Sequence, residues 1–81
     1  MSDFGYSKDG NRVELRGKLG STLNQPIFTL PHGHHPLHDE TFSAESDQGP
    51  VTVTVMAEGS ILVSAETRWT DLNGIRFFID R

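Results

Sequence analysis

The sequence predicts an all-β fold, a small antiparallel sheet or sandwich, from three observations. Apolar side chains recur at every second position in several runs, as in strands with one buried face. Turn dipeptides that contain glycine separate these runs at short spacing, which is typical of hairpins. No stretch requires the 3.6-residue period of an amphipathic helix. The alternating sets are Val13/Leu15, Val51/Val53/Val55, Ile61/Val63/Ala65 and Ile75/Phe77/Ile79.

The first half of the chain is expected to hold a hairpin and two short strands. Asp9-Gly10 predicts a tight turn between residues 4–8 and 11–19, because both residues tolerate positive φ. Short strands are expected at 27–30 and 41–45. Two longer loops are predicted, a polar one at 20–26 and a histidine-rich one at 31–39.

The second half is expected to form two more hairpins. Glu58-Gly59 lies between runs 51–57 and 60–65, and Asn73-Gly74 lies between 68–72 and 75–80. The total of about seven or eight strands matches the usual sandwich pattern. Phe78 falls on the solvent side of the last strand, which indicates a second buried surface such as a subunit contact.

Length and composition predict one domain, residues 1–81, that is only marginally stable as a single copy. A chain this short buries only about 60–65% of its unfolded surface. Without cysteine, neither disulfides nor thiolate-bound zinc can compensate, which leaves self-association or a metal held by histidine and carboxylate. We therefore expect an oligomer, and the resemblance described below makes it a homotrimer.

The net charge of −4 makes nucleic acid a poor partner, because the acidic field repels phosphate. We expect no membrane insertion, since the longest apolar run, Phe77 to Ile79, is too short to span a bilayer. The start of the sequence lacks the charged and apolar regions of a secretory signal. We expect a soluble protein that is not exported by the usual route.

The segment from Pro31 to Glu40 is the candidate metal site. It holds four histidines and two carboxylates, and neutral imidazole binds zinc, nickel or iron. In an extended chain His32 and His34 point the same way, so a trimer could offer six imidazoles to one divalent ion. The alternatives are a solvated loop with no bound ion and a pH-sensitive loop. No cofactor is required.

Trp69 is the candidate ligand-binding residue. Its polar neighbours would allow an exposed indole to stack on a sugar ring. The favoured interpretation is instead that Trp69 caps the core or lies in a trimer interface, as lone aromatics in small β domains usually pack. Phe4, Tyr6 and Phe42 are expected in the core.

Catalytic patterns are missing from the sequence. The serines lack a G-x-S-x-G context, the carboxylates form no arguable pair, and no glycine-rich phosphate loop is present. We expect no enzymatic activity and no catalytic residues.

Four segments together resemble the C-terminal module of bacteriophage tail fibre, tail spike and receptor-binding proteins. They cover nearly the whole chain, and their order and spacing carry the resemblance. The segments are residues 6–17 (YSKDGNRVELRG), residues 27–31 (IFTLP) with Gly33 and Pro36, the strand 51–55 with Glu58-Gly59 and Ile61, and residues 69–77 (WTDLNGIRF).

This resemblance implies a jelly-roll-like β-sandwich that packs as a parallel homotrimer at a fibre tip. It implies a structural protein of the virion tail, made in the host cytoplasm, which joins other fibre segments and binds a host-surface glycan or wall polymer. The chain departs from the family where His34 and His35 replace an aromatic and an arginine. That departure puts ligand contacts at this corner in doubt.

Two other functions fit the same sequence. A trimeric capsid decoration protein would share the size, acidity and β content. A monomeric carbohydrate-binding module of a wall-degrading enzyme would bind sugar through Trp69. Binding to host cells, to expanded capsids or to sugar by a monomer discriminates among the three.

Overall fold

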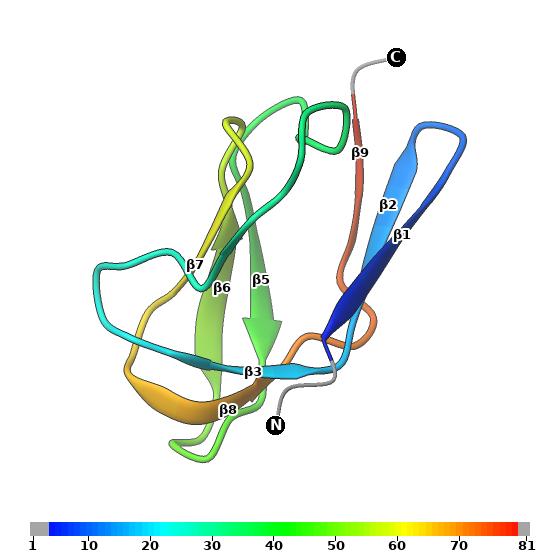
Figure 1. Cartoon of the computed structure of the whole chain (residues 1–81). Coiled ribbons are helices and arrows are strands. Elements are labelled where there is room, and N and C mark those ends of the chain that lie inside the picture. Colours follow the sequence, from blue (N-terminus) through cyan, green and yellow to red (C-terminus); the bar gives the residue numbers. More distant parts are fainter. Residues whose placement is uncertain (1–3, 80–81) are drawn as a thin grey trace.

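The computed structural model describes residues 4–79 of the chain (Figure 1). These residues form nine antiparallel strands joined by loops, and no helix. The all-β prediction is confirmed. No helix in these residues is long and apolar enough to cross a membrane. The strands are β1 (Gly5–Asp9), β2 (Arg12–Arg16), β3 (Lys18–Ser21), β4 (Phe28–Thr29), β5 (Glu40–Ala44), β6 (Val51–Val55), β7 (Ser60–Val63), β8 (Thr67–Asp71) and β9 (Arg76–Phe78).

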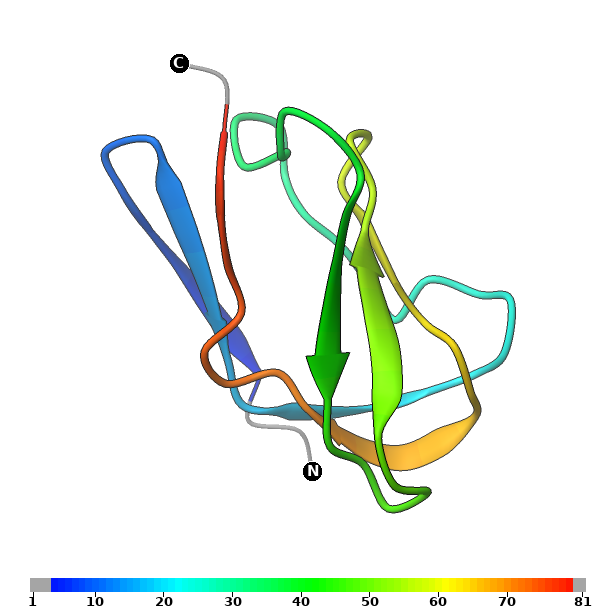
Figure 2. The same cartoon turned by 180° about the vertical axis from the view of Figure 1, so that it is seen from behind.

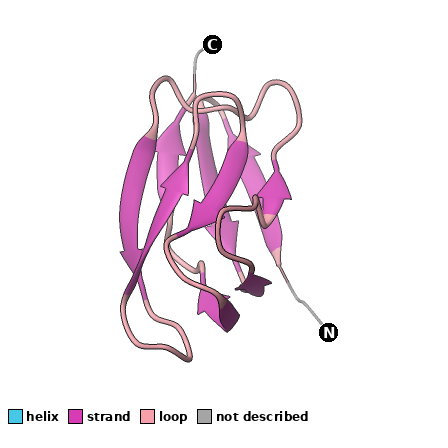
Figure 3. Cartoon of the chain, turned by 90° about the vertical axis from the view of Figure 1, so that its left-hand side faces the viewer, coloured by secondary structure: helices cyan, strands magenta, loops and turns pink. Residues whose placement is uncertain are grey.

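The strands form three sheets, in the orders β1-β2-β9, β3-β8 and β4-β7-β6-β5. The three-stranded and four-stranded sheets face each other, and the β3-β8 ribbon crosses one end of both (Figures 1 and 2). The loops between strands gather toward the two ends of the molecule (Figure 3). This arrangement is compatible with a small β-sandwich.

The first predicted hairpin is present, with its turn shifted by one residue. Asp9 pairs with Arg12, so the two turn residues are Gly10 and Asn11, and Gly10 has a φ of 65°. The predicted strand 11–19 is broken at Gly17, whose φ of 93° bends the chain from β2 into β3. A glycine suits this corner because side chains disfavour positive φ.

The hairpin predicted at Glu58-Gly59 is confirmed and lies at the centre of the four-stranded sheet. Val53 pairs with Val63, and Val55 pairs with Ile61, so the predicted apolar alternation fills one face. Ala65 lies outside the strand, which ends at Val63.

The prediction of a closing hairpin at Asn73-Gly74 is wrong. β8 pairs with β3 and β9 pairs with β2, so this turn connects two different sheets. It runs alongside the Gly17 corner: the Leu72 amide donates to the Gly17 carbonyl at 2.9 Å, and the Gly17 amide donates to Asn73 Oδ1 at 3.0 Å. Two chain segments therefore turn the same corner together, around the fully buried Leu72.

The core lies between the two larger sheets and takes residues from both. Phe4, Tyr6 and Phe42, which we expected in the core, are partly buried and pack against it. The buried apolar side chains are Val13, Leu15, Leu30, Val51, Val53, Val55, Ile61, Val63, Leu72, Ile75, Phe77 and Ile79.

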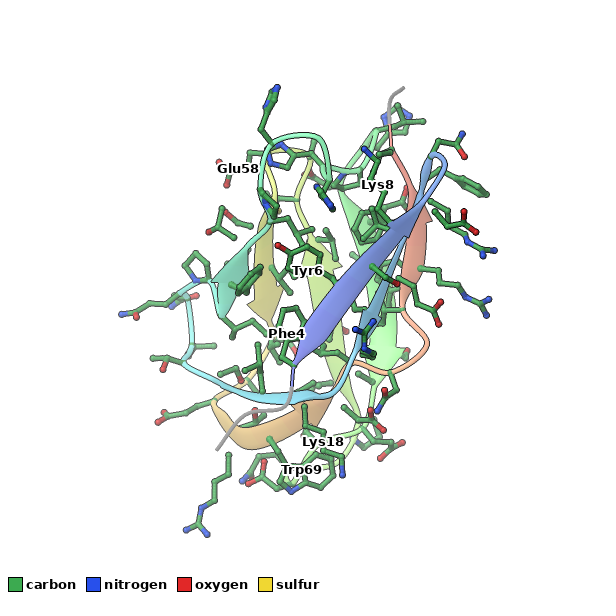
Figure 4. All side chains as sticks on the ribbon, turned by 45° about the vertical axis from the view of Figure 1, so that its right-hand side comes forward. Phe4, Tyr6, Lys8, Lys18, Glu58 and Trp69 are labelled. Atoms are coloured by element: carbon green, nitrogen blue, oxygen red, sulfur yellow. The ribbon has the colours of Figure 1, made fainter. Side chains whose placement is uncertain are left out.

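An aromatic cluster closes the side of the molecule where β1 and β4, the edge strands of the two larger sheets, approach (Figure 4). The Phe4 and Phe28 ring centroids lie 4.9 Å apart, and those of Tyr6 and Phe28 lie 5.7 Å apart. The His34 ring meets Tyr6 edge-on at 5.3 Å. One histidine of the predicted metal loop therefore packs against this cluster.

Candidate functional site

Trp69 lies at the end of the molecule formed by β3 and β8, with Lys18 beside it (Figure 4). Its side chain is 37% exposed, so within a single copy it does not cap the core. The Lys18 Nζ lies 4.5 Å from the centroid of the Trp69 ring, a cation–π contact. The indole ring is thus partly exposed to solvent and has the ammonium group of Lys18 over it.

Asp47 holds the backbone of residues 68 and 69 in place through hydrogen bonds. Its Oδ1 accepts hydrogen bonds from the amides of Arg68, at 2.9 Å, and Trp69, at 3.4 Å, and its own amide donates to the Trp69 carbonyl. Burial acts to raise the pKa of Asp47, but these backbone hydrogen bonds outweigh it and hold the pKa below its ordinary value. Asp47 is therefore ionised near neutrality.

A shallow depression of about 300 Å³ opens beside this backbone. Carboxylates accept hydrogen bonds, whereas amides and guanidinium groups donate them, so the surface offers both kinds of partner to a polyhydroxyl ligand. The lining residues are Asp47, Gln48, Glu66, Thr67 and Arg68.

A chain of buried, hydrogen-bonded hydroxyl groups links β3 to β8 at this end of the molecule. Ser21 Oγ donates to the Ala65 carbonyl at 2.6 Å and lies 2.8 Å from Thr67 Oγ1, which lies 2.8 Å from Thr70 Oγ1. Gly20 allows the close approach of β3 to β8, since a Cβ there would lie 2.9 Å from the Arg68 carbonyl oxygen. This network could not be predicted from the sequence, because nothing local shows that residues 21 and 67 meet.

Asp71 borders a second depression of about 260 Å³ at the same end. The backbone amide of Asn73 donates to Asp71 Oδ1 at 3.0 Å and its side-chain amide at 2.7 Å. These hydrogen bonds, and more weakly the charge of Lys18, hold the pKa of Asp71 below its ordinary value against the opposing effect of burial. This end of the molecule therefore carries two firmly ionised carboxylates.

The histidine loop does not have the extended conformation on which the pairing of His32 and His34 was based. A turn with Gly33 at a φ of 93° separates them, and the His34 amide donates to the Pro31 carbonyl at 3.1 Å. The His32 ring lies against His35, with centroids 6.0 Å apart, whereas His34 lies against Tyr6. The two predicted ligands are thus in different environments.

No group of three or more histidine and carboxylate side chains is placed to hold a metal ion within residues 4–79. A metal bound by His32 and His34 stays a prediction, and it now needs ligands from a second copy. His35 is structural: its Nε2 lies 3.1 Å from the Leu30 carbonyl oxygen, and a Cβ on Gly59 would come within 2.5 Å of it.

Comparisons with protein-family models, curated proteins and solved structures find no match for this chain. The class that fold and site define is an all-β, antiparallel domain with an exposed tryptophan at one end.

Proposed function

We propose that this chain is a non-enzymatic module from the end of a bacteriophage tail fibre or spike, which trimerises and binds a glycan of the host surface. Four sequence segments support the family assignment. In this proposal the facing sheets are a jelly-roll-like sandwich, and three parallel copies form the fibre tip. The protein is then part of the virion tail.

The observation that carries the binding proposal is the exposure of Trp69 beside a polar depression. Sugar rings have apolar C–H faces that pack on an indole, and hydroxyl groups that need donors and acceptors nearby. Trp69 is 37% exposed, and Asp47, Gln48 and Arg68 lie in the adjoining depression. The proposal is that one ligand reaches both the indole and this depression, which is lined by Arg68, the neighbour of Trp69 in the sequence.

A shallow, open site of this kind binds each sugar weakly, so the proposal relies on avidity. Three sites on one trimer, and several fibres on one virion, raise the overall affinity by a factor of about 10²–10⁴ without any new contact. This multiplication links the two halves of the proposal, trimerisation and glycan binding.

The test is to titrate the full chain with purified wall polymers and surface polysaccharides from candidate hosts and to record Trp69 fluorescence at each addition. As the only tryptophan, Trp69 reports directly on its own surroundings. We expect a saturable change in emission, loss of glycan retention in Trp69→Ala, and normal retention in Leu23→Ala, whose exposed side chain lies in the loop between β3 and β4. Equal retention of Trp69→Ala and the unmodified chain would refute the site.

A monomeric carbohydrate-binding module is the second candidate, favoured by the same exposed indole. It predicts the same fluorescence change from a chain that has the mass of one copy. The mass in solution therefore separates the two candidates without knowledge of the ligand.

A further inference from the structure

Lys18 and Asp71 are directly opposite each other in the β3-β8 ribbon, so their side chains lie on the same side of it. Trp69, two residues before Asp71 on β8, lies on that side too, because the Lys18 Nζ is 4.5 Å from the centroid of its ring (Figure 4). After the hydrogen bonds from Asn73, the charge of Lys18 is a further cause of the lowered pKa of Asp71. One ammonium group thus interacts with an indole and with an ionised carboxylate.

An indole beside a carboxylate is a suitable partner for an ammonium ion. The negative face of the ring attracts the charge, and the carboxylate oxygens accept the N–H hydrogen bonds. Aromatic faces are also the usual partners of ligand ammonium groups such as choline and methylated lysine. Lys18 therefore occupies the kind of position that the ammonium group of a ligand takes.

Carboxylates line both depressions at this end of the molecule. β8 leaves the first depression at Arg68 and reaches the second at Asp71, with Trp69 between them in the sequence. The two linings together hold four carboxylates, and the cations of this end are Arg68 and Lys18, which leaves an excess of two negative charges. The carboxylates are Asp47 and Glu66 in the first depression and Glu45 and Asp71 in the second.

This charge balance discriminates among glycans. Polymers that carry phosphate or carboxylate groups are repelled by the four carboxylates. A neutral sugar that displaced Lys18 would leave the indole and Asp71 without their cation. A ligand ammonium group makes the same two interactions as Lys18, so the exchange loses neither of them.

We propose that the glycan bound by this site carries ammonium groups, as polymers of unacetylated amino sugars do, and that one of them replaces the ammonium group of Lys18 over Trp69. This inference rests on the glycan binding in the proposed function and names the chemical class of the ligand. Further ammonium groups along the polymer then meet the carboxylates of the two depressions, which accept their hydrogen bonds.

The test compares two ligands that differ in charge, oligomers of glucosamine and oligomers of N-acetylglucosamine of the same length. The full chain is titrated with each in mildly acidic buffer, where the sugar amine is protonated. Asp47 and Asp71 stay ionised there, because the pKa of each is below 3.8. We expect a saturable change in Trp69 emission at a lower concentration of the glucosamine oligomer, and a weaker response at high salt. Equal or tighter binding of the acetylated oligomer would overturn the inference.

Lys18→Ala tests the exchange of cations. Removal of the competing ammonium group should raise the affinity for the glucosamine oligomer about 2–5-fold, the equivalent of an exposed cation–π contact. Lys8→Ala, which removes an exposed lysine from β1, is the matched control and should leave the affinity nearly unchanged. Asp71→Asn should weaken binding, and circular dichroism checks that each variant is folded. An affinity of Lys18→Ala no higher than that of Lys8→Ala would overturn the exchange.

Trp69→Ala separates this site from a general attraction of cations to an acidic chain, since the substitution leaves the net charge at −4. We expect loss of retention on immobilised glucosamine oligomer, and unchanged retention would overturn the inference. The titrations also distinguish the two proposals. A saturable response to neutral or anionic polymers alone would leave the glycan site standing and overturn the cationic class, whereas no response to any polymer would refute both.

Discussion

The ammonium group of Lys18 lies 4.5 Å from the centroid of the Trp69 ring, so the residue proposed to bind sugar already has a cation on one side. The contact joins β3 to β8 across the end of the molecule. A ligand can occupy the open part of the ring or replace the lysine.

Lys18→Met removes the cation from the indole and keeps a side chain of similar length. We expect a shift in tryptophan emission and a loss of about 0.5–1 kcal/mol in the free energy of unfolding, the usual value of an exposed cation–π contact. Urea denaturation measures this loss. Lys8→Met, an exposed lysine on β1, is the control, and equal effects of both substitutions would contradict the contact.

Asp47 makes stability depend on acid. Its pKa is lower in the folded chain than its ordinary value of 3.8, so its contribution is complete above that value and is lost as the pH falls through the lower, folded pKa. Asp47→Asn should therefore weaken the fall in melting temperature between about pH 5 and about pH 2. Asp9→Asn, in the first hairpin, is the comparison; an unchanged acid profile in Asp47→Asn would show that the hydrogen bonds to Arg68 and Trp69 do not favour the charged form.

Gly59→Ala should destabilise the fold more than Gly10→Ala. Both glycines have positive φ, which costs an alanine about 1–2 kcal/mol. Only at Gly59 would the new Cβ collide with His35, whereas it meets nothing within 4 Å at Gly10. Thermal unfolding of both variants, and of Gly59→Ala combined with His35→Ala, checks this: the double variant should recover part of the loss.

Thr70→Val tests the buried hydroxyl chain. The substitution keeps the shape of the side chain but removes one of the two hydroxyl partners of Thr67, and the loss of one hydrogen bond costs about 0.5–1.5 kcal/mol. Thr52→Val, on the exposed side of β6, should cost less than 0.5 kcal/mol or so, as for ordinary surface changes. Comparable losses in the two variants, by chemical denaturation, would contradict the role of the chain.

Strand positions could be predicted from the sequence because alternation is local. Val51, Val53 and Val55 are buried and the threonines between them are not, as expected. Strand partners were harder, because a turn dipeptide fixes the local bend and not what the next strand pairs with. Asn73-Gly74 has the chemistry of a hairpin turn, yet hydrogen bonds to Gly17, distant in sequence, make it a corner between sheets.

The candidate site was predictable only in part. Trp69 was named, but its exposure depends on where β3 places Lys18, and its support depends on Asp47, a residue that sequence reasoning did not select. The histidine loop was recognisable in the sequence because it holds all four histidines of the chain. The turn at Gly33 could not be read from composition, and it separates the two histidines that an extended chain would align.

The mass of the full chain in solution, by size exclusion with light scattering at micromolar concentration, tests the central claim most directly. The proposal predicts three times the 9.0 kDa of one copy. A trimer that dissociates with a chelator would assign His32 and His34 to a shared metal site, whereas one that survives would show that assembly needs no metal. A mass of one copy, with and without chelator, would contradict the fibre-tip account.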